Sequence, residues 1–169
     1  MKKLILLLLV PIVSFGQITI DTPSNYKEYK YEGNDNTVIY SAEKRLDDKN
    51  VALINVKEIG LGGGANIVNG DFIRYIFERG VYRNQLNRFK KFELFREEID
   101  IFDGIGEAYI IIYSHTLPFD KKNEIQVSSI ITFVKNNKNY IISGSFFFES
   151  FEELFKEHLD IIKTIKFME

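Results

Sequence analysis

The sequence predicts an α+β fold, a three-layer α/β/α sandwich in which a mostly antiparallel sheet of about six or seven strands lies between two main helices. Three observations lead to this prediction. Strand-length apolar segments are joined by short turn sequences through most of the chain. Two longer segments, 72–87 and 151–162, carry apolar residues at helical spacing. One strand near the C-terminus has apolar side chains on both faces, so both faces of the sheet need a cover.

The chain begins with a segment that is typical of a secretory leader. Two lysines precede an apolar run from Leu4 to Val13, which Pro11 interrupts. A membrane-spanning helix needs about 20 apolar residues, roughly twice this run. We therefore expect residues 1–16 to be a cleaved signal peptide and residues 17–169 to form a single domain.

The composition of the mature chain excludes several classes of function. The whole chain has 22 basic and 24 acidic residues, and loss of the two leader lysines moves the net charge from -2 to -4. Nucleic-acid binding needs a basic excess, so we expect no such partner. The chain has no cysteine, so disulfides and a lipid-modified cysteine are both excluded. The expected product is soluble, periplasmic or extracellular, without a lipid anchor or a transmembrane segment.

The N-terminal half of the mature chain is predicted to supply strands first. Residues 18–20 form a short apolar strand, and a turn at 23–25 leads into a second extended piece. The segments TVIYSAEK (37–44) and VALINVKEI (51–59) then alternate in hydrophobicity, which predicts an antiparallel hairpin.

A helix is predicted after a glycine-rich segment, Gly60–Gly64. Asn69 or Asp71 can cap its N-terminus, because a side-chain oxygen there satisfies an unpaired backbone amide. The helix covers 72–87, and its apolar stripe consists of Phe72, Ile73, Ile76, Phe77 and Val81.

The second half of the chain is predicted to be rich in strands. Four segments, 92–102, 106–117, 124–135 and 139–149, are joined by short connections that are typical of hairpins. Alternation in the last strand predicts one face made of Tyr140, Ile142, Gly144, Phe146 and Phe148.

The closing helix has the clearest signals in the sequence. Ser150 and Glu153 have the spacing of a capping box. The apolar stripe that follows is Phe151, Leu154, Phe155, Leu159 and Ile162, and the extended piece IKF ends the element order.

This order of elements resembles the Mog/PsbP-like fold family. The resemblance is carried by ITIDTPSNYKEY, VALINVKEI, DGIGEAYIIIYS and NYIISGSFFFESFEELFKEHLDIIKTIKF, which together span nearly the whole mature chain. It implies a twisted antiparallel sheet between helices. It also implies a non-enzymatic role through protein contacts, as in the photosystem accessory subunit and the nuclear-transport cofactor of that family. No functional residue transfers to this chain.

The glycine-rich segment GLGGGA (60–65) matches G-x-G-x-x-A, the pattern of a dinucleotide-binding turn. Such a turn must pass directly from a parallel strand into a helix. Here the preceding strand belongs to a hairpin and several residues separate the glycines from the helix, so we expect no cofactor. A loop that covers a ligand remains the alternative.

The sequence predicts no catalytic residue and no metal site. His115 and His158 are its two histidines, too few for a zinc site without several carboxylates. No G-x-S-x-G nucleophile motif is present. An acidic cluster lies at Glu97, Glu98, Asp100 and Asp103; we interpret it as a solvated strand edge that discourages strand addition, with a carboxylate pair or a calcium site as the alternatives.

The predicted partner surface lies on the first helix. Tyr75, Arg79, Tyr82 and Leu86 share one face at helical spacing, away from the core stripe. Tyrosine and arginine are favoured at interfaces because they combine large contact area with polar ends. The alternative is that these side chains only cover their neighbours.

The predicted function is that of an exported, non-enzymatic binding or interaction protein of the bacterial cell envelope. Its expected partner is another envelope or secreted protein. The alternative is a small-ligand carrier or weak hydrolase with a pocket under the Gly60–Gly64 loop.

Overall fold

The fold is built around one antiparallel sheet of seven strands in the order β2-β3-β4-β8-β7-β6-β5. The computed structural model describes residues 18–31, 36–46, 49–59, 90–116, 124–136 and 138–167. The strands are β2 (Lys27–Glu28), β3 (Val38–Leu46), β4 (Lys49–Ile59), β5 (Lys90–Phe102), β6 (Gly106–Thr116), β7 (Ile125–Lys135) and β8 (Lys138–Phe147). Every neighbouring pair is antiparallel, which confirms the predicted α+β class.

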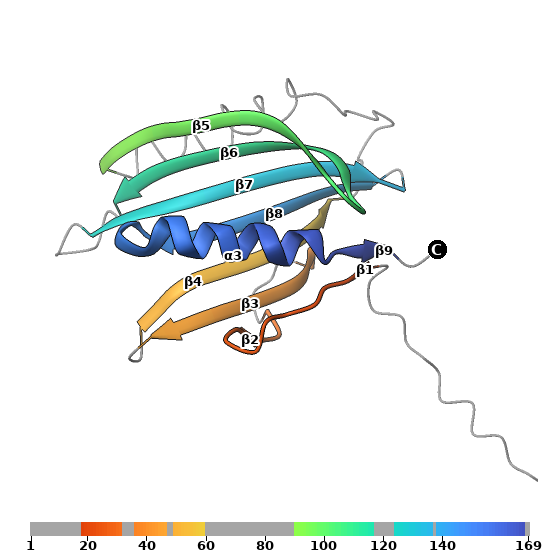
Figure 1. Cartoon of the computed structure of the whole chain (residues 1–169), viewed down its shortest axis with the longest axis horizontal. Coiled ribbons are helices and arrows are strands. Elements are labelled where there is room, and N and C mark those ends of the chain that lie inside the picture. Colours follow the sequence, from red (N-terminus) through yellow and green to blue (C-terminus); the bar gives the residue numbers. More distant parts are fainter. Residues whose placement is uncertain are drawn as a thin grey trace, which may run out of the picture.

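The helix α3 (Phe151–Lys163) lies along one face of this sheet, over β8 (Figure 1). It follows a short 3-10 turn, η2 (Phe148–Ser150), directly after β8. The two ends of the described chain then meet in a second, two-stranded sheet, β1 (Ile18–Thr19) with β9 (Lys166–Phe167). The leader at 1–16 and the predicted helix at 72–87 lie outside the described residues.

The main hydrophobic core fills the space between α3 and the sheet. It forms because alternate residues of each strand turn towards the helix. In β8 these are Tyr140, Ile142, Gly144 and Phe146, all buried. Phe148 was predicted to continue this face, and that prediction is wrong: the chain leaves the strand after Phe147, so Phe148 belongs to η2 and is exposed.

The start of α3 differs from the predicted capping box. Ser150 is the N-cap residue, but its side chain makes no capping hydrogen bond. The reason is that the helix does not start from an open loop. The 3-10 turn leads straight into it, and the backbone amide of Phe151 donates to the Phe148 carbonyl oxygen. Ser150 itself has φ -113° and ψ 12°, outside the extended region in which an N-cap side chain reaches the amides of the first helical turn.

The second face of the sheet also buries apolar side chains. Ile111 and Tyr113 of β6 are nearly inaccessible, and Tyr109 and Ile130 pack against them. A face with such residues needs a cover, as the predicted three-layer arrangement requires. The helix predicted for that layer, 72–87, is outside the described residues.

The turn between β5 and β6 shows why the sequence places glycines there. Gly104 and Gly106 have φ angles of 85° and 91°, in the left-handed region that favours glycine. A Cβ on Gly104 would also lie 2.9 Å from the carbonyl oxygen of Ile165. The predicted hairpin connection at Asp103-Gly104 is confirmed.

Candidate functional site

The partner surface predicted from the sequence, Tyr75, Arg79, Tyr82 and Leu86, lies outside the described residues. The Gly60–Gly64 segment does so too. The described part of the chain offers four features for a candidate site: the buried histidines, the polar contacts of α3, a cavity at one end of the sheet, and the exposed strand β5.

His158 lies in the main core, where no solvent reaches it. It projects from α3 between the rings of Phe146 and Phe155, and its Nε2 is 3.3 Å from the Ser129 hydroxyl. Burial lowers the pKa of His158 to about 3, so the ring is neutral at pH 7. Ser129 is also inaccessible, so no substrate carbonyl can approach this serine and histidine.

His115 forms a similar contact on the opposite face of the sheet. It lies within β6, and its Nε2 is 2.9 Å from the Ser128 hydroxyl of β7. The Tyr113 ring lies beside it, with ring centroids 5.5 Å apart. Burial lowers the pKa of His115 to about 4, so this ring is neutral as well. Both histidines are therefore structural hydrogen-bonding groups.

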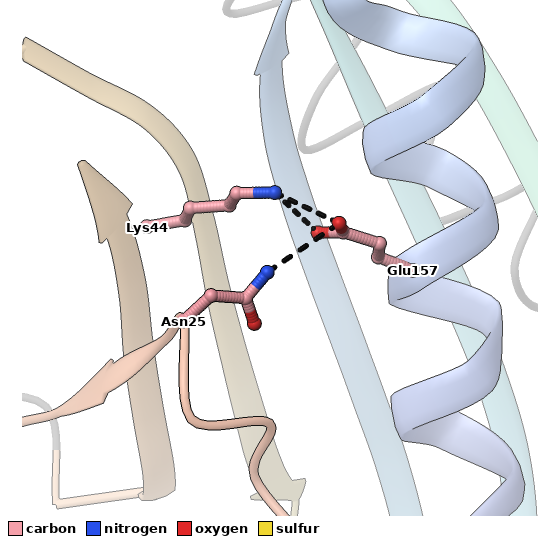
Figure 2. A network of polar contacts seen from close by, with 3 residues as sticks. All are labelled: Asn25, Lys44 and Glu157. Carbon is pink, nitrogen blue, oxygen red and sulfur yellow. Dashed lines mark hydrogen bonds and ion pairs between the residues drawn. The ribbon is translucent and has the colours of Figure 1, made fainter. Parts of the chain in front are cut away.

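A polar network ties α3 to the edge of the sheet (Figure 2). Lys44 of β3 donates to both carboxylate oxygens of Glu157, at 2.8 and 2.9 Å, and Asn25 donates to the same carboxylate at 3.5 Å. The Lys44 ammonium also lies 5.9 Å from the centre of the Tyr26 ring. Burial and the Glu157 charge both raise the pKa of the Tyr26 hydroxyl. These contacts hold the N-terminal segment, β3 and the helix together.

Replacing Lys44 by methionine should lower the free energy of unfolding by about 2 kcal/mol, because the Glu157 carboxylate would keep its partly buried position without its cation. Lys163→Met is the matched control. It removes a pair of the same 2.8 Å length, Lys163 with Asp160, whose side chains are both 58% exposed, and should have a much smaller effect because solvent screens exposed pairs. Urea unfolding measures both losses of free energy. Equal losses would contradict the idea that partial burial makes the Lys44–Glu157 pair contribute more than an exposed pair.

A cavity of about 340 Å³ opens at the end of the sheet where β4 and β7 begin and β8 ends; we call it the end cavity. Its lining is Val51, Glu124, Ile125, Phe147, Phe148, Glu149 and Ser150. A second hollow of about 190 Å³ shares Val51 and Phe147 with it. Ile59, after which the Gly60–Gly64 segment begins, lies at the other end of β4 and pairs with Asn139.

The end cavity has the character of a binding site for an apolar group. Ile125 and Phe148 in its wall are partly exposed, and the Phe148 ring lies 6.4 Å from the Phe95 ring of β5. Two carboxylates, Glu124 and Glu149, lie in the same wall. The described residues hold no group of three or more metal-ligating side chains. The lining of the end cavity can therefore contact a ligand through apolar side chains and through the negative charge of two carboxylates.

Strand β5 carries exposed apolar side chains that no motif in the sequence singles out. The acidic cluster lies on it and on the following turn, as an edge of the sheet. Four large apolar side chains on the same strand are exposed: Leu94, Phe95, Ile99 and Ile101. Leu94 and Phe95 are adjacent, whereas Ile99 and Ile101 alternate with Asp100, a pattern that is visible in the sequence. It is equally typical of a half-buried strand, so only the place of β5 in the sheet shows that they face solvent.

Comparisons with known proteins bear on the fold. No family model and no curated protein matches the sequence. The solution structure of cyanobacterial PsbP (CyanoP) from Synechocystis sp. PCC 6803 is similar with a TM-score of 0.59 at 13% identity, covering 89% of this chain and 86% of that one. A Pseudomonas aeruginosa protein of unknown function, PA94, gives a TM-score of 0.49 at 10% identity, covering 88% and 96%. The chain has the PsbP-like fold that its sequence predicts.

Proposed function

We propose that this protein is an exported, non-enzymatic interaction protein of the bacterial cell envelope that works by binding another envelope or secreted protein. The leader sequence is the reason for proposing export. No helix in the described ranges is long and apolar enough to cross a membrane.

The observation that carries the binding role is the distribution of exposed apolar side chains. Of the eight large apolar residues that are exposed in the described part of the chain, four lie on β5 and two more, Ile125 and Phe148, line the end cavity. Exposed apolar residues gathered in this way are typical of contact surfaces, whereas single ones are ordinary. The two histidines are buried and neutral, so neither offers an accessible group that would favour a catalytic role.

Substitution of Tyr75 and Tyr82 by alanine should reduce capture of the partner from an envelope extract by about tenfold or more, since buried interface tyrosines often contribute 1 to 2 kcal/mol each. The melting temperature should change by only a few degrees. Tyr31→Ala, which truncates an exposed tyrosine elsewhere, should leave capture unchanged. Unchanged capture by the double variant would remove the predicted face of 72–87 from consideration. An exported protein that retains residues 1–16 would contradict the proposed leader cleavage.

The end cavity favours one second candidate, a carrier of a small ligand. Its volume of about 340 Å³ is near the lower limit of ordinary ligand pockets. Native mass spectrometry of the gently extracted protein should then detect a bound small molecule, which Ile125→Trp at the cavity wall should displace. Protein that is free of any bound molecule after gentle extraction would contradict the carrier role.

A further inference from the structure

The end cavity lies beside the start of α3, and its lining combines apolar side chains with a polar corner. Val51, Ile125 and Phe148 supply apolar surface, and the last two are exposed, so a ligand can reach them. Glu149 and Ser150 lie in the same lining. Sites for small molecules typically have this composition, in which a mostly apolar lining holds the ligand and a few polar groups fix its orientation.

The volume of the end cavity limits the size of its ligand. A dry, apolar cavity of about 150 Å³ in another protein holds one benzene molecule. The end cavity measures about 340 Å³. It therefore has room for one aromatic ring with a short chain attached, or for an aliphatic group of the same size.

The charges at the polar corner disfavour an anionic ligand. The N-terminus of a helix attracts anions, because its first backbone amides have no partner within the helix. At the start of α3, however, three carboxylates already lie there: Glu149 in the 3-10 turn, and Glu152 and Glu153 in the first helical turn. They would repel a further anion, such as the carboxylate of a fatty acid.

The same corner suits a cation. The carboxylate of Glu149 can accept hydrogen bonds from an ammonium group. The Ser150 hydroxyl is a second acceptor, since it makes no capping hydrogen bond to α3. An aromatic ring such as that of Phe148 attracts a cation to its face. Glu124, also in the lining, takes part in another interaction of the protein, so the ammonium group is assigned to Glu149.

We propose that the end cavity binds a small apolar amine in its protonated form. The ammonium group would lie at Glu149 and Ser150, and the apolar body would lie against Val51, Ile125 and Phe148. Opposite charge selects the ammonium group, and the apolar lining selects the body. This proposal rests on the carrier role proposed above and names the chemical class of its ligand.

The test compares three probes of similar size by nuclear magnetic resonance titration of the 15N-labelled mature chain at neutral pH. They are phenethylammonium, the neutral phenethyl alcohol and the anionic hydrocinnamate. The ammonium should bind about fivefold more tightly than the alcohol, because only the cation gains the ion pair and the contact with the aromatic ring. Hydrocinnamate should bind most weakly. The chemical-shift changes should centre on the residues that line the end cavity.

Three variants locate the source of the preference. Glu149→Gln should remove it, so that the ammonium and the alcohol bind within about twofold of each other. Glu152→Gln is the matched control, because it removes the same charge from an exposed residue of the neighbouring turn that is not part of the described lining; here the preference should remain. Ile125→Trp should weaken the ammonium and the alcohol alike, because the indole ring takes up the apolar part of the cavity.

Four results would overturn the proposal: no binding of the ammonium, equal binding of the alcohol or the anion, equal effects of Glu149→Gln and Glu152→Gln, or unchanged binding by Ile125→Trp. If one of these results is found while native mass spectrometry still detects a bound molecule, the ligand class alone is wrong and the carrier role stands. If the extracted protein is also free of any bound molecule, the carrier role is rejected as well. Capture of an envelope partner tests the interaction function separately.

Discussion

Lowering the pH from 7 to 5 should reduce the free energy of unfolding by about 4 kcal/mol, about 2 kcal/mol for each of the two histidines. His158 and His115 are buried as neutral rings, with pKa values lowered by burial to about 3 and about 4. In the unfolded chain both pKa values return to about 6.5. A whole domain is stabilised by only about 5 to 15 kcal/mol, so this loss is large.

The sign of the effect follows from where the protons bind. Above pH 6.5 the histidines are neutral in both states, so they add no pH dependence. Below pH 6.5 the unfolded chain takes up a proton at each histidine, whereas the folded chain does not until the pH approaches 4 for His115 and 3 for His158. Stability should therefore fall by about 1.4 kcal/mol per pH unit for each histidine across that window.

Urea unfolding followed by far-ultraviolet circular dichroism, at several pH values between 7.5 and 5, measures this slope. The sequence contains two histidines, and carboxylates titrate mainly below this pH range. The slope of stability against pH in this range therefore belongs to the two histidines. His158→Gln, which stays neutral, should remove about half of the slope. His115→Gln is the paired variant and should remove the other half. A free energy of unfolding that stays constant from pH 7 to 5 would contradict the buried, neutral state of both rings.

Replacing Gly144 by alanine should lower the free energy of unfolding by about 3 kcal/mol, although alanine is usually better than glycine in a strand. A Cβ at this position would lie 2.5 Å and 2.7 Å from atoms of the Phe146 ring and 2.7 Å from the Ser129 hydroxyl. Contacts below 3 Å force a neighbour to move.

The Phe146 ring has little room to move. It is buried among Phe151, Phe155 and His158, with ring centroids 6.0, 6.3 and 5.4 Å away. All three neighbours belong to α3, so a displaced ring pushes on the helix and its packing against β8. The tight packing of a protein interior makes such shifts costly.

A double variant separates this clash from other effects of the mutation. Phe146→Leu removes the ring atoms that an alanine Cβ would meet, so Gly144→Ala combined with Phe146→Leu should be less destabilised than the sum of the two single variants by about 1 kcal/mol or more. Gly106→Ala is a useful comparison, because its φ is 91° but no atom lies within 4 Å; it should cost about 1 kcal/mol through the backbone alone. Simple additivity in the double variant would contradict the steric explanation.

The secondary structure in the second half of the chain could be read from periodicity with small errors. Strand β6 begins at Gly106 as predicted, and α3 begins at Phe151 and ends one residue beyond the predicted end. Local signals were sufficient there because each segment repeats its pattern several times between clear turns. The errors lie at junctions, at Phe148 and at the Ser150 cap, where the chain passes directly from strand through a 3-10 turn to helix.

The candidate sites were harder to predict than the fold. The surface at Tyr75, Arg79, Tyr82 and Leu86 stays a prediction, since it lies outside the described residues. The end cavity could not be found from sequence, because Val51, Glu124 and Phe148 come from three distant segments. No local pattern links residues that become neighbours only through strand order.

The sequence by itself determined the α+β class, the order of strands and helix in the described chain, and which residues alternate towards a core, because these depend on the periodicity of neighbouring residues. The tertiary structure decided which strand is outermost, and so made Ile99 and Ile101 of β5 exposed while equally apolar residues such as Ile110 of β6 are buried. The physical reason is that exposure of a strand depends on its neighbours in the sheet and on the layer above it, and both come from parts of the chain that are remote in sequence.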